Sequence, residues 1–471
     1  MKEFLKASRS SRGLFVWLAA PVEKMVRKEF VTMFLKLEQY LFYLLLFSIP
    51  FQTRKILWYD SWRFNEWQSV SVYATDILLV VLLIFWFLDF KLKFQKSDYF
   101  LVAFLTVSVI SITNSTNPIV SWFQWFKLVE FSIFYWYLIN YALGKFKLYN
   151  SFLAIFIGGI LQSVIAIIQF LKQSSVGLRL FGESIINSDL SGVASFYLSD
   201  GEKIIRAYGT TPHPNVLAVY LFLALFSFYF VYLYSRLHSE HNPLADNWDK
   251  TMLVFYGVLL FAFFTTFSRT IIFIWFVAFA LRTISIRLIR HYRLVFGTKD
   301  GRKRIKAILL VNLCVLVIFG SLYFNEIKAR LIISSEDQAV ELRTFYAGES
   351  LKTGFNLFGV GIGNFTGWLA ENKPNLPNFT YQPVHNIYLL IYSETGILGI
   401  LFFVTFLIYI IKDFVLKTHL KKSYHFSLLF FLCSLLFISF FDHLFLTLQQ
   451  GRFVLWSTLG LLTYLSKGDI I

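Results

Sequence analysis

Residues 383–411 read PVHNIYLLIYSETGILGILFFVTFLIYII, and this stretch decides the fold class. A long polar segment ends here in a proline and a histidine. The residues that follow are almost wholly apolar, with Glu394 as their only Asp, Glu, Lys or Arg. About 20 consecutive apolar residues in a helix suffice to cross the roughly 30 Å hydrocarbon core of a bilayer. The stretch therefore predicts a membrane-spanning helix with the titratable imidazole of His385 at its border.

The composition of the whole chain agrees with a membrane protein. Of 471 residues, 57% are hydrophobic and only 15% are charged, whereas soluble proteins have about 25% charged residues. The formal net charge is +16, but Lys and Arg lie between apolar runs, so we expect no nucleic-acid partner. Cys314 and Cys433 both fall within apolar runs and offer neither a disulfide framework nor metal-ligand spacing.

Hydrophobic runs of spanning length recur along the chain and predict an all-α polytopic membrane protein of about twelve transmembrane helices. The runs lie near residues 36–51, 74–90, 98–113, 119–142, 151–171, 215–235, 251–268, 270–286, 306–323, 386–411, 425–446 and 451–466. Two long polar loops separate them, and the larger loop contains a helix-like stretch from about residue 335 to 351.

Lys and Arg are denser in the short loops and at the N-terminus than in the long loops. Because basic residues concentrate on the cytoplasmic side of a membrane protein, we expect both termini in the cytoplasm. The expected location is the cytoplasmic (inner) membrane. The predicted organisation is a basic cytoplasmic segment (1–35), helices 1–5 (36–171), an extracytoplasmic loop (172–214), helices 6–9 (215–323), a large extracytoplasmic loop (324–385) and helices 10–12 (386–471). Residues 52–73, rich in Trp and Tyr, are expected to lie at the outer membrane interface.

Histidines on the predicted outer side are the first candidates for chemistry. An imidazole has an unperturbed pKa near 6.5 and is the usual general base at neutral pH. His385, His213 and His443 lie toward the outside, whereas His238, His241, His291, His419 and His425 look like solvated inner surface. For His385 the alternative is a helix-capping or interfacial role, but its place after a long loop, followed by Asn386 and Tyr388, favours function.

Arginines near the same border are the second group. Burying arginine in a bilayer is costly, so Arg269, between two apolar runs, is a functional candidate, with an interfacial anchor as the alternative. Arg206 lies at the end of the 172–214 loop. Because a guanidinium grips phosphate oxygens in a bidentate fork, the two arginines predict a phosphate-bearing ligand. Arg343 is either a third member of this group or a surface charge on a loop helix.

Other polar residues in apolar surroundings have less certain roles. Lys127 and Glu130 are three residues apart and favour a structural ion pair. Glu394 lies too far into its helix to reach His385 and is expected to pair within the bundle. Asp442 and His443 either line the same cavity or cap helices, and the sequence does not choose between these. Gly359-Val360-Gly361-Ile362-Gly363 lacks the strand and helix of a dinucleotide fingerprint and predicts a tight turn packed against the membrane surface.

Over residues 200–465 the chain resembles the bacterial O-antigen ligase and O-antigen polymerase superfamily of membrane glycosyltransferases. Four places carry the resemblance: Arg206–Asn215, which ends in His213-Pro214-Asn215; Ser268-Arg269; Asn356–Phe365, where the family's proline is Asn356; and His385-Asn386-x-Tyr388-Leu389 with Glu394-x-Gly396-x-x-Gly399.

The resemblance implies transfer of a glycan from an undecaprenyl-pyrophosphate carrier to a hydroxyl of a glycan, lipid or protein acceptor, outside the cytoplasmic membrane and without metal or other cofactor. It implies an inverting reaction in which His385 is the catalytic base. The candidate substrate-binding residues are Arg206, Arg269, His213, Asn215, Arg343 and Asn386. The main alternative is a transporter or flippase for a lipid-linked or anionic solute, although no inverted repeat supports it. A scaffold of an envelope complex is a third interpretation.

Overall fold

The computed structural model describes residues 33–59, 64–234, 244–288, 299–332, 338–420 and 423–468, so most of the basic 1–35 segment lies outside the described residues. A helix whose described part covers residues 33–48 comes first. It is followed by α2 (Ala74–Leu88), α3 (Lys96–Ser111), α4 (Pro118–Tyr137), α5 (Leu143–Lys145), α6 (Leu148–Lys172), α7 (Pro214–Tyr234), α8 (Leu244–Thr265), α9 (Arg269–Leu288), α11 (Lys299–Leu322), α12 (Phe324–Leu331), α13 (Gln338–Leu351), α14 (Phe365–Asn372), α15 (Ile387–Thr418), α16 (Ser423–Ile438), α17 (Leu444–Thr447) and α18 (Gln449–Leu465).

Helices of membrane-spanning character dominate the molecule. Within the described ranges, six are long and apolar enough to cross a membrane, judged by length and composition: Lys96–Asn114, Leu148–Lys172, Pro214–Leu233, Trp248–Thr265, Gly301–Leu322 and Ile387–Thr418. Three shorter apolar helices are Ala74–Leu88, Arg269–Ala280 and Tyr424–Ile438. Each of the twelve hydrophobic runs in the sequence overlaps a helix of the structure. The chain is a mostly helical, multi-pass membrane protein.

Two short antiparallel hairpins accompany the helices in the described part of this mostly helical chain. Strand β1 (Arg54–Tyr59) pairs with β2 (Ser69–Tyr73), and β3 (Ser195–Tyr197) pairs with β4 (Lys203–Ile205). Burial alternates along β2, residue by residue, as on a strand with one buried face. The sequence Ser-Val-Ser-Val-Tyr already carries this period of two, but it is too short to stand out among long apolar runs.

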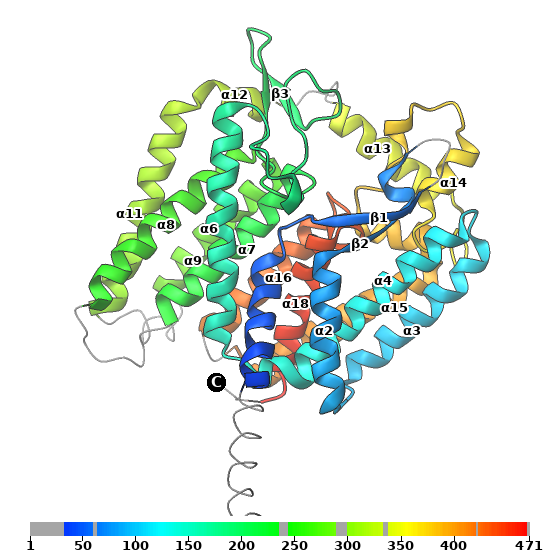
Figure 1. Cartoon of the computed structure of the whole chain (residues 1–471), viewed down its shortest axis with the longest axis horizontal. Helices are drawn as coiled ribbons and strands as arrows, with labels where there is room; N and C mark the ends of the chain where they lie inside the picture. The colour runs from blue at the N-terminus through cyan, green and yellow to red at the C-terminus, as the bar shows by residue number, and fades with distance from the viewer. Residues whose placement is uncertain are drawn as a thin grey trace, which may run out of the picture.

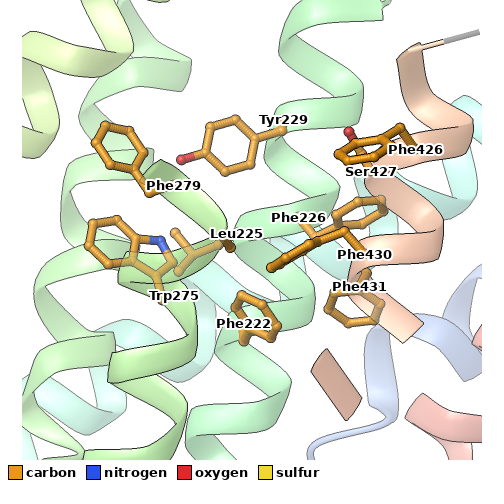
Figure 2. A pocket seen from close by; sticks show the side chains of 11 residues that line it. Phe222, Leu225, Phe226, Tyr229, Trp275, Phe279, Phe426, Ser427, Phe430 and Phe431 are labelled. Carbon is orange, nitrogen blue, oxygen red and sulfur yellow. The ribbon is translucent and has the colours of Figure 1, made fainter. Parts of the chain in front are cut away.

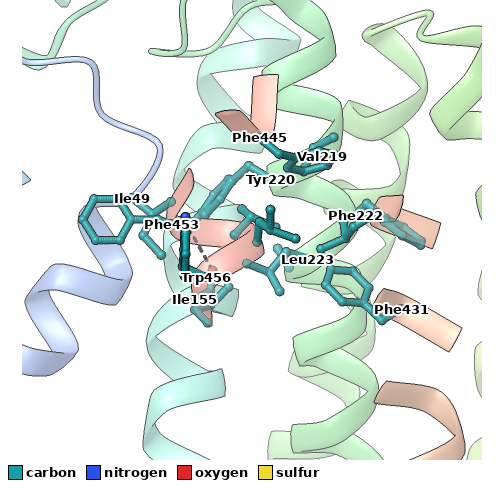
Figure 3. Packing of buried hydrophobic residues seen from close by; sticks show 14 of the residues in the cluster. Ile49, Ile155, Val219, Tyr220, Phe222, Leu223, Phe431, Phe445, Phe453 and Trp456 are labelled. Atoms are coloured by element: carbon teal, nitrogen blue, oxygen red, sulfur yellow. Dashed lines mark hydrogen bonds between the residues drawn. The ribbon is translucent and has the colours of Figure 1, made fainter. Parts of the chain in front are cut away.

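Helix α7 lies at the centre of the hydrophobic core. It packs against α6, α8, α9 and α18, and Figure 3 shows its side chains Tyr220, Phe222 and Leu223 among residues of α6, α16 and α18. The hydroxyl of Tyr220 donates to the carbonyl oxygen of Ile155 at 3.2 Å, which satisfies a polar group that the core buries completely. The start of α7 is therefore held at a fixed place in the bundle.

Two adjacent glycines of α6 allow α7 and α8 to approach closely. A Cβ atom on Gly158 would lie 2.4 Å from the Tyr220 hydroxyl. A Cβ atom on Gly159 would lie 2.4 Å from the Cβ of Ala224 and 2.8 Å from Leu259. Small residues at helix contacts are the usual device for close packing in membranes.

The two long loops lie at one end of the molecule. In Figure 1 the β3 hairpin and helices α12, α13 and α14 gather at the end opposite the C-terminus, and α7 begins beneath them. The elements that carry the candidate site residues therefore meet at this end, which we call the loop end.

One histidine differs from the sequence expectation. His425, interpreted as solvated surface, is buried between the rings of Tyr424 and Phe414, at centroid distances of 4.5 and 5.6 Å. The folding of α16 against α15 encloses it, and the local sequence does not reveal that contact.

Candidate active site

The segment from Arg206 to His213 is fixed by two glutamines of α6. The side-chain oxygen of Gln169 accepts from the backbone N–H groups of Tyr208 and Gly209 at 3.1 and 2.7 Å. Gln162 accepts from Thr210 N–H at 2.9 Å. Gly209 has φ +59, a left-handed conformation in which glycine has no side-chain penalty. These hydrogen bonds hold the segment that leads into α7, and nothing in the local sequence of Gln162 and Gln169 indicates this role.

Arg206 and Asn215 meet at the start of α7. The Arg206 guanidinium, only 6% exposed, donates to the carbonyl oxygen of Thr266 at 2.7 Å and to Asn215 Oδ1 at 2.7 Å. Ser268 donates its hydroxyl to the same Asn215 oxygen at 3.0 Å, and the Asn215 amide donates to Asp442 at 2.9 Å. One asparagine thus joins the loop before α7, the start of α9 and the turn after α16.

His213 closes the first turn of α7. Its Nδ1 accepts from the backbone N–H of Asn215 at 3.1 Å, so this ring satisfies one of the donors that a helix start leaves unpaired. Burial and the charge of Arg206 lower the pKa of His213 well below its ordinary value, so its ring is neutral at neutral pH.

His385, Asp442 and His443 form the centre of the site. The rings of His385 and His443 are 4.8 Å apart between centroids. One ligand-type atom from each of the three residues lies within 4.8 Å of the others. Nδ1 of His385 is buried without a hydrogen-bond partner among the described residues, which is unusual because buried polar atoms are normally paired. The imidazole of His385 has an open position for a proton from elsewhere.

Asn386 and Trp67 frame this centre. The side-chain oxygen of Asn386 accepts from the backbone N–H groups of Tyr388 and Leu389 at 2.9 and 3.1 Å, so the helix cap belongs to Asn386 and not to His385. Trp67, from the short helix η1 (Glu66–Gln68), packs edge-on against His443 with centroids 4.9 Å apart. Thr447 bonds Nδ1 of His443 at 2.6 Å.

Asp442 is the anionic partner of the cluster. Burial alone would raise its pKa, but His443, His385, His213 and the Asn215 hydrogen bond outweigh burial and hold the pKa below its ordinary range. The carboxylate is therefore ionised at neutral pH. Its position favours any positive charge that forms on the neighbouring imidazoles.

Four arginines surround the centre electrostatically. Burial and then Arg330 lower the pKa of Arg206 to about 9, with smaller contributions from Arg343 and Arg269. Arg206 consequently stays protonated at neutral pH. Arg343 also lowers the pKa of His385 and of His443. Arg330, on α12, lies 5.7 Å over the ring of Phe196; sequence reasoning missed it, because a cation on a short loop helix looks like surface.

The structure thus brings some of the candidate residues into direct contact and others only into electrostatic range. His385, His213, Arg206 and Asn215 belong to one connected cluster with Asp442 and His443. Arg269 and Arg343 act on it through charge. Asp442 also accepts from the backbone N–H of Leu444, the first residue of α17, at 3.3 Å, so this carboxylate contacts a helix start; a cavity-lining role for Asp442 and His443 stays a prediction.

The glycine run and Glu394 contact each other. The partners of the Glu394 carboxylate among the described residues are backbone groups in and just after this run: it accepts from Gly363 N–H at 2.8 Å and from Phe365 N–H at 3.3 Å. The run packs against the first turns of α15, because a Cβ on Gly359 would lie 2.4 Å from the Glu394 backbone. Gly396, with φ +70 and ψ −170, breaks α15 at this contact.

A second polar group lies beside the centre. Lys127 bonds Glu130 at 2.9 Å, the ion pair that the sequence indicates, and also Asp76 at 2.5 Å. Lys127 lines a pocket of about 570 Å³, its open mouth included, together with Glu394, Arg452 and Trp67. Trp67 connects this pocket to His443.

Comparison with known proteins relates one part of the chain to a known family. No curated protein matches the chain. Residues 254–404 match the model of the family described as O-antigen ligase. The match spans Arg269, Arg330, Arg343 and His385, whereas Arg206, Asn215 and Asp442 lie outside it. The match implies glycan transfer of the O-antigen ligase or polymerase type, with a lipid-linked glycan donor and a glycan or lipid acceptor in a membrane. It supports membership of this glycosyltransferase-like protein in the O-antigen ligase and polymerase superfamily.

Proposed function

We propose that the protein transfers a glycan from an undecaprenyl-pyrophosphate carrier to an acceptor hydroxyl at the outer face of the cytoplasmic membrane. The observation that carries this proposal is the buried, unpartnered Nδ1 of His385 beside Asp442, with cationic side chains nearby. Such a reaction requires a neutral base to accept the proton of the acceptor hydroxyl. It also requires fixed cations to stabilise the departing pyrophosphate. The loop end of the molecule is then the extracytoplasmic end, and both termini are cytoplasmic.

The reaction follows from these positions. His385 accepts the proton of the acceptor hydroxyl as its oxygen attacks the anomeric carbon, and Asp442 stabilises the imidazolium that forms. The bond between the anomeric carbon and the phosphate oxygen breaks on the opposite side, so configuration inverts. Negative charge grows on the departing pyrophosphate, and Arg206, Arg269 and Arg343 stabilise it in a partly dehydrated site.

Other candidate residues position these groups. Asn215 holds the Arg206 guanidinium and the Asp442 carboxylate in one arrangement. His213 and Asn386 accept hydrogen bonds from the backbone at the starts of α7 and α15. In this proposal the same two residues also contact the substrate. The O-antigen ligase match does not favour the transporter alternative.

Metal-free chemistry is part of the proposal. His385, Asp442 and His443 are ligand types that could hold a metal ion, but hydrogen bonds already engage Asp442 and the Nδ1 of His443. The transfer assay is therefore run with a chelator throughout.

The first prediction concerns the base. His385→Ala should lower transfer about 10²- to 10⁴-fold, the usual contribution of general-base catalysis. Purified protein is incubated with lipid-linked glycan and acceptor, and the covalent product is measured. His419→Ala is the matched control, because His419 is exposed beyond the other end of α15. Full activity of His385→Ala would remove the base role, and absence of any product from the unmodified protein would favour transport.

A further inference from the structure

The cavity of about 570 Å³ beside His443, its open mouth included, combines polar and aromatic side chains, and we call it the polar pocket. Its lining includes Lys127, Glu394, Arg452, Gln124, Thr366 and Trp67. Pockets for small ligands usually measure about 300–1,000 Å³ and carry a few polar groups that orient the ligand. The polar pocket has this character.

The polar pocket borders the proposed base. Trp67 packs edge-on against His443, with centroids 4.9 Å apart, and Thr447, also in the lining, bonds Nδ1 of His443 at 2.6 Å. Pro383, two residues before His385, is a further part of the lining. A ligand in this pocket therefore lies next to the two histidine rings.

The arginine side of the centre is built from other residues. Arg206 bonds Asn215, and Asn215 bonds Asp442, and none of these three described residues lines the polar pocket. An in-line displacement places the attacking hydroxyl and the leaving phosphate on opposite faces of the anomeric carbon. Separate places for the acceptor and for the pyrophosphate meet this requirement.

The lining has hydrogen-bonding capacity that the protein does not use. The Thr366 hydroxyl is buried, with the residue 3% exposed, and has no partner among the described residues. Arg452 donates to the carbonyl oxygen of Leu446 and to Gln124 Oε1, both at 2.6 Å, which uses two of the five N–H donors of a guanidinium. Because an unpaired buried hydroxyl is costly, these groups indicate a ligand with hydroxyls of its own.

Aromatic rings complete the lining. Phe131, Phe445 and Trp456 are buried and face the same cavity. The C–H groups on one face of a pyranose ring pack against aromatic rings, while the hydroxyls at its edge take hydrogen bonds. The mixture of rings and polar groups therefore suits a sugar.

A cavity of similar size shows the contrast. It lies along α7, α9 and α16 and measures about 580 Å³, its open side included, and no described residue in its lining is charged. Figure 2 shows Phe222, Trp275 and Phe431 among its side chains. A sugar would leave its hydroxyls unpaired there, so of these two cavities the polar pocket is the one that suits a sugar.

The cations of the polar pocket are already opposed by carboxylates. Lys127 bonds Asp76 at 2.5 Å and Glu130 at 2.9 Å. Asp76, Glu130 and Glu394 also lie within electrostatic range of Arg452. A carboxylate on a ligand would therefore find no unopposed cation in this lining, and an enclosed charge without a partner is costly.

We propose that the polar pocket binds the terminal sugar ring of the acceptor, and that it admits a neutral ring and excludes one that bears a carboxylate. This inference rests on the proposed function for the presence of an acceptor hydroxyl. Thr366 and Arg452 bind ring hydroxyls, and the hydroxyl next to the histidines is the one that reacts. The carboxylates around Lys127 and Arg452 set the preference for a neutral ring.

The first test removes one hydroxyl. Thr366→Val replaces the O–H by a methyl group of similar size and breaks no hydrogen bond within the described protein. Saturation-transfer NMR measures binding of methyl glucoside, galactoside and mannoside to the detergent-purified full chain. At least one of these sugars should bind, and Thr366→Val should weaken that binding about three- to tenfold, as for one lost hydrogen bond.

Two variants guard against an indirect effect. Thr366→Ser keeps the hydroxyl and should bind the sugar as the unmodified protein does. Thr106→Val, at an exposed position of α3, is the matched control and should also bind normally. In the transfer assay Thr366→Val should raise KM for the acceptor and not for the lipid-linked donor. Absence of sugar binding, equal binding by Thr366→Val, or a higher KM for the donor alone would overturn the inference.

The second test concerns charge. Each methyl hexoside is compared with its methyl hexuronoside, and the unmodified protein should prefer the neutral ring about tenfold or more. Glu130→Gln removes one negative charge but keeps an oxygen that can accept from Lys127, so it should reduce this preference. Glu371→Gln, at an exposed position of α14, should not. Equal binding of neutral and acidic sugars by the unmodified protein would refute the selection.

Failure of the pocket and failure of the proposed function give different results. A protein that binds neutral sugars through Thr366 but forms no glycan product retains the pocket and loses the proposed reaction. A protein that transfers glycan while Thr366→Val has an unchanged KM for the acceptor retains the reaction and loses the pocket.

Discussion

His385 is placed so that its imidazole is neutral and ready to accept a proton. Burial lowers its pKa, Asp442 opposes that effect, and Arg343 adds to it, with a net result below the ordinary value of 6.5. The same carboxylate that limits the drop in pKa also lies where it can stabilise the protonated ring. The surroundings of His385 therefore keep its imidazole neutral and place the Asp442 carboxylate beside it.

This balance sets the pH dependence of transfer. The neutral, active form of His385 is lost as the pH falls through its pKa, so kcat/KM should stay level from neutral pH downward and decline only below about pH 6.5. Arg343→Gln removes a nearby positive charge that lowers this pKa, and the acid decline should move to higher pH. Lys373→Gln, at an exposed loop position, should leave the profile in place. An acid decline centred above pH 6.5 in the unmodified protein would contradict this assignment.

The sequence points to those members of the candidate cluster that stand out against an apolar background and not to those that do not. His385 and Arg206 are conspicuous because each ends a polar loop before a hydrophobic run. Arg330 and Trp67 reach the centre only through the folding of α12 and of the β1–β2 hairpin. Nothing in their local sequence distinguishes them from surface side chains.

Among the elements, α6 shows how packing depends on single atoms. Gly159→Ala would place a methyl group against Ala224 and Leu259, and overpacking of this kind costs about 1–3 kcal/mol. We expect a lower midpoint of thermal unfolding in detergent. Gly320→Ala in α11, where no atom lies within 4 Å of the new Cβ, is the control and should be neutral or slightly stabilising. Equal midpoints for the two variants would show that α6 and α7 have room to separate.

Helix α15 marks the limit of what an apolar run can reveal. Its start is evident from residues 383–411, whereas the helix, Ile387–Thr418 in the structure, continues beyond the predicted end at residue 411. The break at Gly396 is not evident, because it depends on a contact with the distant Asn356, whose carbonyl accepts from Ile397 N–H at 3.1 Å. Helices are encoded locally, whereas their irregularities depend on the partners that the fold supplies.

For the whole molecule, the proposed orientation can be tested by labelling. Cys314 and Cys433 are exposed and are first replaced by alanine. Ser191→Cys, exposed in the 172–214 loop, should then react with a membrane-impermeant maleimide on intact cells. His419→Cys, exposed at the other end of α15, should react only after permeabilisation. The reverse pattern would place the candidate site in the cytoplasm and end the case for an extracytoplasmic reaction.

The central place of α7 has a consequence for how the protein is made. This helix is apolar enough to enter a membrane by itself, yet 89% of its most apolar window is enclosed by the rest of the chain. Ribosomes synthesise it before α8, α9, α16 and α18, so newly inserted α7 must first be solvated by lipid on the sides that these helices later cover. Maturation is therefore a lateral exchange of lipid for protein around one helix, and it completes only when the last span has left the translocon.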